Sequence, residues 1–387
     1  MIIRHPVGRK IDPVSIISRD SGGSLRLAKE RFKRILAAMS KVNIMGHNID
    51  RLSELMVSLG ARAYKGKQLF KWLYKFQQYD FTLMTDLTKD LRNRLDEGYV
   101  FEGLKPTKEA QSVDGTEKFL FALDDGHPIE MVIIPEEDKR TVCLSSQAGC
   151  ALACSFCATG TMGLLRQLTV AEIVGQLVFV RDRFGLMGFN NLVFMGMGEP
   201  LQNYENVVEA IRLITNEYGM DISPKRITVS TSGITPQIKK LADSGLKVRL
   251  AVSLQAATQE KREKIMPVAK TFGLDKLKEA VKYYTEKGKS RVTFEYILFK
   301  GFNDTKEDVK ALARYVQGIP CKINILAYNP VAGLPFERPS EEEVDWFGRQ
   351  LYPLVPAVTV RRSRGVDIDA ACGQLAAREK SGGLSHA

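Results

Sequence analysis

The sequence is poor in histidine and has no long hydrophobic run, and each absence narrows the possible classes of protein. Only 4 His occur among 387 residues, and none stands close to the cysteine-rich stretch, so a zinc site of neighbouring Cys and His lacks its usual ligands. No apolar run could span a membrane, and the first 20 residues lack the apolar core of a signal peptide. The 6 Cys are too few to indicate a disulfide scaffold. We expect a cytoplasmic protein without a membrane partner, although the basic, serine-containing N-terminus also fits an organellar leader.

Three of the cysteines stand together in the run GCALACSFCATG. Cys150, Cys154 and Cys157 are separated by 3 and then 2 residues. Three thiolates on one loop can hold three corners of a [4Fe–4S] cluster, and an electron-transfer cluster usually has a fourth cysteine. This loop has no fourth cysteine, so one iron is left open to bind a substrate or cofactor. A zinc site, a redox pair at Cys154 and Cys157, and buried core cysteines remain as alternatives.

Positive charge is concentrated near the N-terminus. The net charge is +11, and residues 1–110 contain 21 Lys and Arg against 12 Asp and Glu. Within residues 62–76, basic side chains are interleaved with aromatic ones, a combination that suits RNA phosphates and unstacked bases. We favour a polyanion partner such as RNA. Two plainer interpretations remain, in which the charges form a solvated face and the aromatic residues form the core of a small helical domain.

Changes in composition divide the chain into five segments. Residues 1–45 form a basic extension with an amphipathic helix after Ser24, and residues 46–98 predict a helical accessory domain that binds RNA. Residues 99–140 predict a β-hairpin linker segment around an Asp-Asp-Gly turn. Residues 141–356 alternate strands with helices, and residues 357–387 form a C-terminal segment that carries Cys372.

The alternating region predicts an α/β fold with a parallel sheet wrapped by helices. Helix starts are indicated at Thr169, Thr235, Thr305 and Ser340 by capping residues, and a further helix is expected over Asp275–Lys287. Six βα units fit a partial (β/α)6 barrel better than a closed barrel of eight. The strand candidates are Val142–Ser146, Asn191–Met195, Arg226–Ser230, Lys247–Leu254, Arg291–Leu298, Lys322–Ala327 and Ala357–Arg361.

Polar and glycine-rich motifs follow five of these strands. The carboxyl ends of parallel strands meet on one rim, where α/β proteins place their chemistry. Glycines at 196 and 198 would let the backbone approach a ligand, Glu199 could accept from a ligand ammonium, and serines and an asparagine could bind hydroxyls or a carboxylate. The rim therefore suits a zwitterionic cofactor with a ribose beside the open iron. The candidate cofactor-binding residues are Gly198, Glu199, Ser230, Ser253, Leu254, Gln255 and Asn329.

These motifs resemble those of the radical S-adenosylmethionine (SAM) superfamily, and most closely its RlmN/Cfr branch of RNA adenine methyltransferases. The likeness extends from about residue 46 to about residue 377. It implies a radical SAM partial barrel with a small N-terminal helical accessory domain. The matching stretches are the cysteine loop with Phe156, PIEMVIIPEEDKRTVCLSSQAGC, NLVFMGMGEPLQNYENV, ITVSTSGITPQI, NILAYNPVAGLPF and RGVDIDAACGQLA.

The resemblance implies a mechanism that uses two SAM molecules in each turnover. One SAM methylates Cys372, and a second, bound to the open iron, is cleaved to a radical that takes a hydrogen from the S-methyl group. The methylene radical then adds to the adenine ring. By match to the family motifs, Glu130 removes the ring proton and Cys143 resolves the adduct by forming a disulfide with Cys372. By themselves, these residues would be a salt-bridged glutamate and two ordinary cysteines. Cys321 matches no functional position and is expected in the core.

The resemblance also implies the partners. These are 23S rRNA at the peptidyl-transferase centre, tRNA at the adenosine 3′ of the anticodon, and an electron donor such as flavodoxin or ferredoxin, with the enzyme acting as a monomer. Carbon 2 of adenosine is the expected methylation site. Carbon 8, as in the Cfr branch, a radical SAM enzyme with a non-RNA substrate, and a non-catalytic RNA-binding protein are the alternatives.

Two departures from the family pattern stand out. Residues 253–256 read SLQA where a histidine is expected as the third residue, so Gln255 would have to replace it. The extension before residue 46 is longer than the family core needs.

Overall fold

The structure is a computed structural model that describes residues 41–137, 139–186 and 188–376. The helix expected after Ser24 lies outside these residues. The chain divides into two compact units, a smaller one built around Ile49–Glu102 and a larger one that includes Gly103–Leu123 and most of the chain from His127 onward.

The smaller unit is a set of short helices closed by a two-stranded sheet. Its core contains fully buried leucine and aromatic side chains, among them Leu52, Leu73 and Tyr74, whereas Tyr64 and Phe76 are exposed. The aromatic residues of this region are therefore divided between core and surface. The elements are β1 (Val42–Asn43), α2 (Ile49–Ser58), α3 (Lys65–Phe70), a π-helical turn (Lys71–Lys75), a 3-10 turn (Phe81–Leu83), α4 (Lys89–Gly98) and β2 (Tyr99–Val100).

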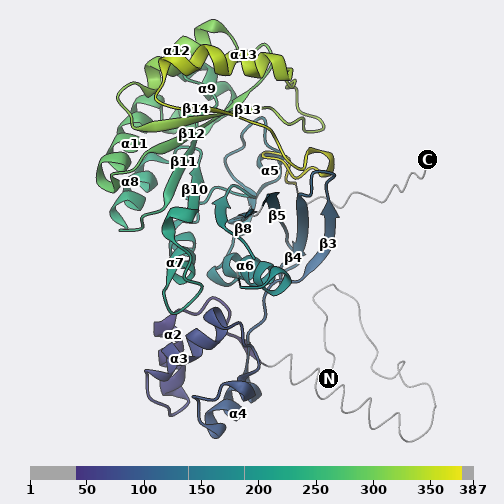
Figure 1. Ribbon diagram of the computed structural model, residues 1–387, viewed down its shortest axis with the longest axis vertical. Coiled ribbons are helices and arrows are strands. Elements are labelled where there is room, and N and C mark those ends of the chain that lie inside the picture. Colours follow the sequence, from purple (N-terminus) through teal and green to yellow (C-terminus); the bar gives the residue numbers. More distant parts are fainter. Residues whose placement is uncertain (1–40, 138, 187, 377–387) are drawn as a thin grey trace, which may run out of the picture. The chain divides into compact units, whose positions relative to one another are not determined.

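The larger unit is built on one ten-stranded sheet in the order β14-β13-β12-β11-β10-β9-β6-β5-β4-β3 (Figure 1). The strands from β14 to β6 in this order are parallel, which confirms the predicted partial barrel. The outward residues of these strands are buried because helices cover that face of the sheet. The parallel strands are β6 (Lys139–Cys143), β9 (Asn191–Phe194), β10 (Ile227–Thr231), β11 (Arg249–Ser253), β12 (Val292–Leu298), β13 (Cys321–Ala327) and β14 (Val358–Arg361).

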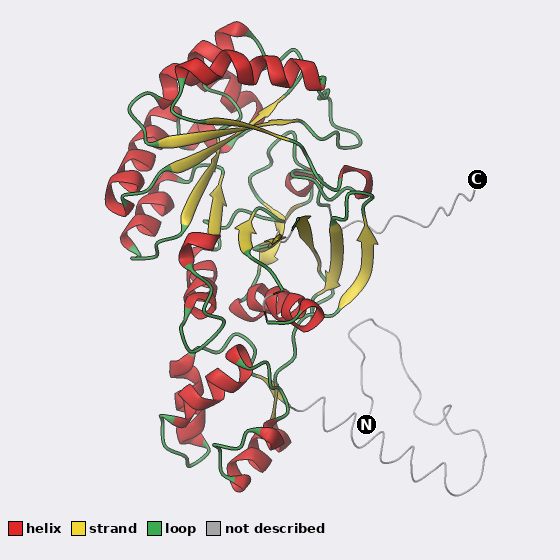
Figure 2. Ribbon diagram, viewed as in Figure 1, coloured by secondary structure: helices red, strands yellow, loops and turns green. Residues whose placement is uncertain are grey.

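Helices connect these strands and cover their outer face (Figure 2). Capping boxes are present at Thr169, Thr305 and Ser340, as predicted. Thr235 is the first helical residue of its helix and not the cap. The crossover helices are α6 (Val170–Phe184), α7 (Tyr204–Thr215), α8 (Thr235–Asp243), α11 (Leu274–Gly288), α12 (Lys306–Val316) and α13 (Glu341–Leu351), with α9 (Gln259–Ile265) and α10 (Val268–Thr271) between β11 and α11.

The predicted hairpin is present but is not a separate linker. Strands β4 (Glu117–Ala122) and β5 (Pro128–Glu136) pair antiparallel, β3 (Pro106–Gln111) pairs with β4, and β5 also pairs with β6. The physical reason is that β5 is apolar on both faces, since Ile129, Val132 and Ile133 are at most 1% exposed. Such a strand is most stable inside a sheet, so this segment extends the barrel sheet.

The C-terminal segment is fixed to the turn between β3 and β4. Gly365 donates its N–H to Asp114 at 2.9 Å, and the Ser112 hydroxyl donates to Asp367 at 2.6 Å. Gly365 has φ +65°, and a Cβ there would lie 2.8 Å from Thr116 and Ala370 side-chain atoms, so the position requires glycine. This anchor holds residues 366–376 beside the sheet.

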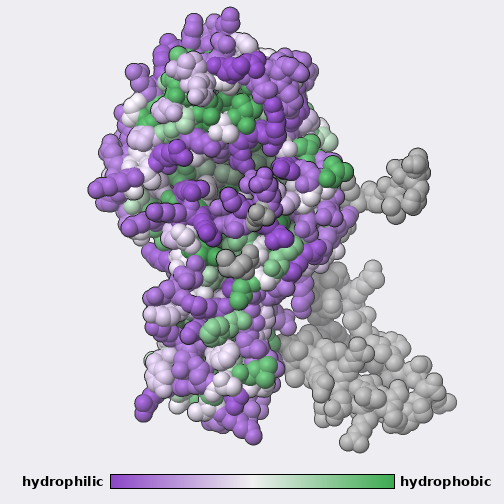
Figure 3. All heavy atoms as spheres, viewed as in Figure 1, coloured by the Kyte–Doolittle hydropathy of each residue, from purple (hydrophilic) through white to green (hydrophobic). Residues whose placement is uncertain are grey.

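The described part of the chain contains no helix that is both long and apolar enough to cross a membrane. The face of the larger unit drawn in Figure 3 is mostly hydrophilic, with scattered apolar residues. Cys321 is buried in β13, as expected.

Candidate active site

A short hairpin presents the cysteine loop. Strand β7 (Gln147–Cys150) pairs antiparallel with β8 (Gly163–Gln167), and α5 (Ala158–Thr161) follows the last cysteine of the loop. The two strands approach so closely that a Cβ on Gly149 would lie 1.9 Å from the Gly163 carbonyl oxygen. Gly149 has φ +75°, so both the close approach and the backbone conformation require glycine. The sequence GC at this point thus ties the first cysteine to a fixed hairpin.

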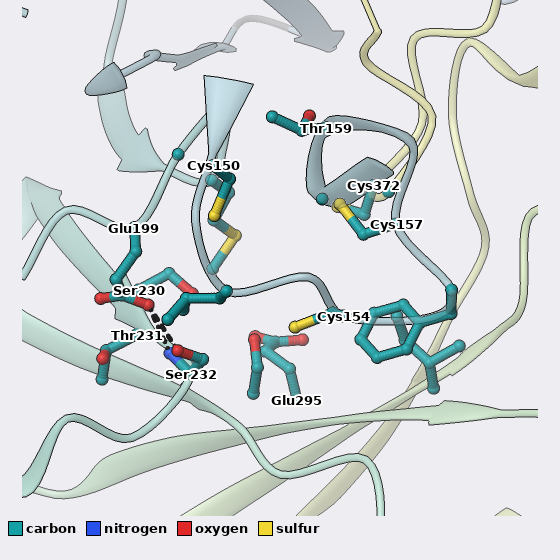
Figure 4. Close-up of a pocket in the computed structure, with 18 of the residues that line it drawn as sticks. Cys150, Cys154, Cys157, Thr159, Glu199, Ser230, Thr231, Ser232, Glu295 and Cys372 are labelled. Carbon is teal, nitrogen blue, oxygen red and sulfur yellow. Dashed lines mark hydrogen bonds between the residues drawn. The ribbon is translucent and has the colours of Figure 1, made fainter. Parts of the chain in front are cut away.

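Cys150, Cys154 and Cys157 all line one cavity of about 170 Å³ at the rim of the barrel (Figure 4). Burial raises the pKa of the Cys150 thiol to about 12, and it also raises the pKa of Cys154 and Cys157. Neutral thiols are favoured there unless a metal stabilises the thiolates.

The donor set fits a cluster better than one metal ion. No three His, Cys, Asp or Glu side chains among the described residues surround a position for a single ion. In a cubic cluster each thiolate binds a different iron, so its three ligands do not converge on one point. The cysteines share a cavity and come from one loop, which is the arrangement that three corners of a [4Fe–4S] cluster need.

Glu199 forms one wall of this cavity. Its carboxylate accepts hydrogen bonds from the Ser232 N–H at 2.8 Å, the Ser232 hydroxyl at 2.7 Å and the Leu201 N–H at 3.1 Å. Burial raises the pKa of Glu199, and these hydrogen bonds oppose that shift. Ser232 was not identified from the sequence, although it lies within the STSG motif.

The two glycines before Glu199 serve packing. A Cβ on Gly196 would lie 2.7 Å from the backbone of Leu144, and a Cβ on Gly198 would lie 2.4 Å from the Gln147 side chain. The expectation from sequence was that these glycines let the backbone approach a ligand. The close neighbours in the structure are protein atoms at the end of β6 and in β7, but both glycines also line the cavity, so that expectation stays a prediction.

The other candidate cofactor residues differ in where they lie. Ser230, Ser253 and Gln255 line the cavity with Gly198 and Glu199, whereas Leu254 and Asn329 do not line it. The Gln255 carboxamide oxygen accepts from the Ile297 N–H at 2.7 Å, and Gln255 has φ +61°. Asn329 donates to the Cys372 carbonyl at 3.3 Å, so it contacts the C-terminal segment.

A buried arginine joins the loops of the rim. Arg262, on α9, is fully buried. Its guanidinium donates to the carbonyl oxygens of Leu254 at 3.1 Å, Ser232 at 2.5 Å and Ser253 at 3.3 Å. It therefore fixes the loops after β10 and β11 against each other. The surrounding sequence, QEKREKI, is typical of a surface helix and gives no sign of this role.

Cys143 and Cys372 lie together in a second cavity of about 290 Å³. Both thiols are free. Burial raises the pKa of Cys143, and the charge of Cys372 raises it further, which places the two sulfurs within electrostatic range. Cys372 also lines the cavity of the cluster cysteines, and it is the only one of the five site cysteines that lines both. The structure thus brings together residues that are 229 positions apart in the chain.

Glu130 lies apart from both of these cavities. It lines a third cavity of about 470 Å³, where its carboxylate forms an ion pair with Lys118 at 3.0 Å and accepts the Ala376 N–H at 3.0 Å. The residue is 3% exposed. The C-terminal segment therefore covers Glu130 in this structure, and the ion pair corresponds to the plainer interpretation of that residue.

A partial barrel with three cysteines on the loop after its first strand, facing a cavity at the strand ends, defines a radical SAM enzyme. Residues 144–316 match the family model described as the radical SAM superfamily. Residues 42–100 match the ribosomal RNA large subunit methyltransferase N-terminal domain.

Two named relatives and one crystal structure are similar to this chain over most of its length. The dual-specificity RNA methyltransferase RlmN of Geobacter sulfurreducens is 45% identical over 86% of this chain and 92% of its own length. That of Geotalea uraniireducens is 42% identical over 88% of this chain and 98% of its own length. The crystal structure of a radical SAM methyltransferase from Sphaerobacter thermophilus has a TM-score of 0.82 and 41% identity, and covers 87% of this chain and 100% of its own.

The chain belongs to the RlmN family of radical SAM RNA methyltransferases. It is accordingly an enzyme that uses a [4Fe–4S] cluster and SAM, and its substrate is RNA.

Proposed function

We propose that this enzyme methylates carbon 2 of adenosine and that Cys372 carries the methyl group as S-methylcysteine. The observation that supports this proposal is the position of Cys372. It borders the cavity of Cys150, Cys154 and Cys157 on one side and the cavity of Cys143 on the other. A carrier has to meet both the source of the radical and the thiol that releases the product, and a residue between two cavities can do so.

The first cavity would hold the cluster and the second SAM of each turnover. Cys150, Cys154 and Cys157 would bind three irons, and the cluster would supply the electron that cleaves SAM reductively. Glu199 would accept from the SAM ammonium, and hydrogen bonds from Ser232 and Leu201 support this by orienting its carboxylate. Ser230 and Ser253 offer hydroxyl groups from neighbouring strand ends. An external donor such as flavodoxin or ferredoxin would provide the electron.

Cys143 would release the product. Once the carbon from Cys372 is bonded to carbon 2 of the adenine, the Cys143 sulfur attacks the Cys372 sulfur. A disulfide forms between the two cysteines, and the bond between the Cys372 sulfur and the added methylene carbon breaks with its electron pair on carbon. That carbon takes up a proton and stays on the base as the methyl group. Burial raises the pKa of Cys143, so its thiol has to give up its proton as it attacks.

Glu130 would take the proton from carbon 2. One carboxylate oxygen pairs with Lys118, and the Ala376 N–H occupies the other. For Glu130 to reach a base beside Cys372, Ala376 has to withdraw from it. The proposal therefore includes a movement of this segment when RNA binds.

The proposed substrates are 23S rRNA at the peptidyl-transferase centre and tRNA at the adenosine 3′ of the anticodon. The relatives carry dual specificity in their names. The basic residues of the smaller unit suit the RNA backbone, among them Arg62, Lys65, Lys67, Lys71 and Lys75.

Mapping of the methyl group tests the proposal. Reconstituted enzyme is incubated with SAM, a reductant and either a 23S rRNA fragment or tRNA, and the digested nucleosides are separated by mass spectrometry. We expect 2-methyladenosine in both RNAs, none with Cys372→Ala, and near-normal yield with Cys321→Ala, a core cysteine outside the site. 8-Methyladenosine would assign the enzyme to the Cfr-type reaction, and unmodified RNA would contradict the proposal.

A further inference from the structure

Glu295 is a cavity carboxylate to which the chemistry above gives no role. It lies in the middle of β12, between Phe294 and Tyr296, which are both fully buried on the other face of the strand. Its side chain lines the cavity of the cluster cysteines (Figure 4). The Asn324 carboxamide donates to Glu295 Oε1 at 2.9 Å and so fixes the carboxylate. The second oxygen, Oε2, makes no hydrogen bond to the described residues, which leaves one acceptor for a ligand.

The two carboxylates of this cavity face different partners. Glu199 follows β9 and is held by Ser232 in the loop after β10. Glu295 lies two strands beyond β10 in the sheet, on β12, and its partner Asn324 is on β13. Leu326 of β13, Arg361 of β14 and Cys372 line both cavities, so Glu295 lies beside the strands that border both of them, where the base to be methylated has to come.

The second cavity gives a base a route to this place. Arg361, Arg362 and Arg364 line it; Arg362 is paired with Glu341 and Asp345, so Arg361 and Arg364 are the cations that suit the phosphates flanking a nucleotide turned out of its stack. Most residues that line both cavities are apolar or cationic, and such side chains can contact the faces of a purine ring. A base that enters from the arginines would reach Cys372, which lines both cavities, and the first cavity also contains Glu295. The shared residues are Met195, Leu326, Arg361, Cys372 and Leu375.

We propose that Glu295 Oε2 accepts a hydrogen bond from the exocyclic 6-amino group of the target adenine, so that Glu295 selects adenine. This inference rests on the proposed function. Adenine offers a donor at this position, whereas hypoxanthine offers an acceptor there, and both have a hydrogen at carbon 2. A site built around one hydrogen bond strongly rejects an analogue that lacks it.

The test compares two enzymes on two RNAs. The target adenosine of a tRNA anticodon-arm substrate is kept or replaced by purine riboside, which lacks the amino group, and kcat/KM for methylation is measured for wild type and Glu295→Leu. We expect Glu295→Leu to lower kcat/KM on the order of 10- to 100-fold with adenosine and less than about 3-fold with purine riboside. The effect of the amino group on ring reactivity is common to both enzymes and cancels in this comparison.

Two further readouts separate selection of the base from a structural role. Formation of 5′-deoxyadenosine and methylation of Cys372, measured without RNA, should be unchanged in Glu295→Leu. The control Glu279→Leu, on the exposed face of α11, should match wild type on both RNAs.

If Glu295→Leu fails to fold, Glu295→Gln replaces it. Its carboxamide oxygen can keep the Asn324 contact while its NH₂ group faces the base, so the ratio of inosine to adenosine methylation should rise.

Three results would overturn the inference. An equal loss on both RNAs with normal SAM cleavage would mean that Glu295 does not contact the amino group. Loss of SAM cleavage itself would place Glu295 at the cofactor. Wild-type enzyme that leaves carbon 2 of adenosine unmethylated would overturn the proposed function and this inference together, and it would be seen before any variant is made.

Discussion

The cluster loop and the C-terminal segment line the same cavity, but contacts of different kinds hold them there. Cys150, Cys154 and Cys157 are separated by 3 and 2 residues and are held by the adjacent β7–β8 hairpin. Cys372 is held by α5, far earlier in the chain, because the Ala158 N–H donates to the Gly373 carbonyl at 2.8 Å and the Thr159 hydroxyl donates to Leu375 O at 2.5 Å. One half of the site is therefore local, and the other half depends on the tertiary structure.

This difference has a functional consequence. The three cysteines of the cluster loop should act as one unit, so that removing any one of them abolishes cluster binding and SAM cleavage. The C-terminal segment is held by a few hydrogen bonds at separate points, so changes in it should uncouple individual steps. Variants in the two regions test this contrast.

The largest effect is expected in the cluster loop. Cys154→Ala removes one of three iron ligands, so we expect loss of bound iron and of 5′-deoxyadenosine formation, both to background. Iron content, visible absorbance and SAM cleavage are measured after anaerobic reconstitution, with Cys321→Ala as the matched control. Retention of the cluster absorbance in Cys154→Ala would contradict the assignment of this ligand.

Cys372→Ala should separate the two halves of the site. The cluster ligands are intact, so SAM should still be cleaved reductively, whereas RNA methylation should fall below detection because the carrier sulfur is missing. The measurement is the ratio of 5′-deoxyadenosine to methylated nucleoside. If this variant methylates RNA at the wild-type rate, Cys372 is not the carrier.

Glu130→Gln, a change at the residue that the C-terminal segment covers, should lower RNA methylation less than Cys372→Ala does. Loss of a general base lowers rates by about 10²- to 10⁴-fold, and glutamine keeps the contact with the Ala376 N–H. We expect methylation to slow by about that factor while methylation of Cys372 continues, which peptide mass spectrometry can follow. Lys118→Met serves as a comparison, since it keeps Glu130 and removes its ion-pair partner together with the hydrogen bond from Lys118 to the Asp369 carbonyl. A normal rate in Glu130→Gln would assign the proton transfer to another group.

The smallest effect is expected at the anchor of the segment. Burial acts to raise the pKa of Asp114, but hydrogen bonds from Thr116, Gly365 and Ser112 outweigh it and lower the pKa from 3.8 to about 2. Because the folded value lies below the ordinary one, the anchor contributes fully above pH 4 and is lost as the pH falls toward 2.

Asp114→Asn should therefore loosen residues 364–370 at neutral pH. We expect amide hydrogen exchange there to be about 3- to 10-fold faster than in wild type at pH 7, and the difference to narrow below pH 4. Exchange in β12 serves as the internal reference. A difference that stays constant down to pH 2 would mean that the Asp114 charge does not hold the segment.

The difference between local and tertiary contacts also explains which parts of the fold and of the site could be predicted from the sequence. The capping boxes at Thr169, Thr305 and Ser340 and most strands of the barrel are local patterns, and the structure has them where they were expected. The first strand, expected at Val142–Ser146, instead spans Lys139–Cys143. The pairing of β5 with β6 was missed because local patterns show which segments are strands but leave open which edges meet.

The residues missed within the site are polar side chains with distant partners. Arg262 looks like a surface residue of α9, yet it is fully buried and bonded to three carbonyl groups. Glu295 looks like an ordinary polar residue on a strand until its neighbours Asn324 and Cys372 are known. Cys143, Glu130 and Cys372 were singled out only through resemblance to the family, since their own surroundings in sequence are unremarkable.

The central claim is that Cys372 passes its methyl carbon to carbon 2 of adenine and that Cys143 releases the product, so Cys143→Ala tests it most directly. Reacted with RNA and SAM, this variant should accumulate a covalent protein–RNA complex. Mass spectrometry of the digested complex should find the Cys372 sulfur joined through one carbon to carbon 2 of adenine. Normal turnover without such a complex, or a link at another residue, would contradict the account.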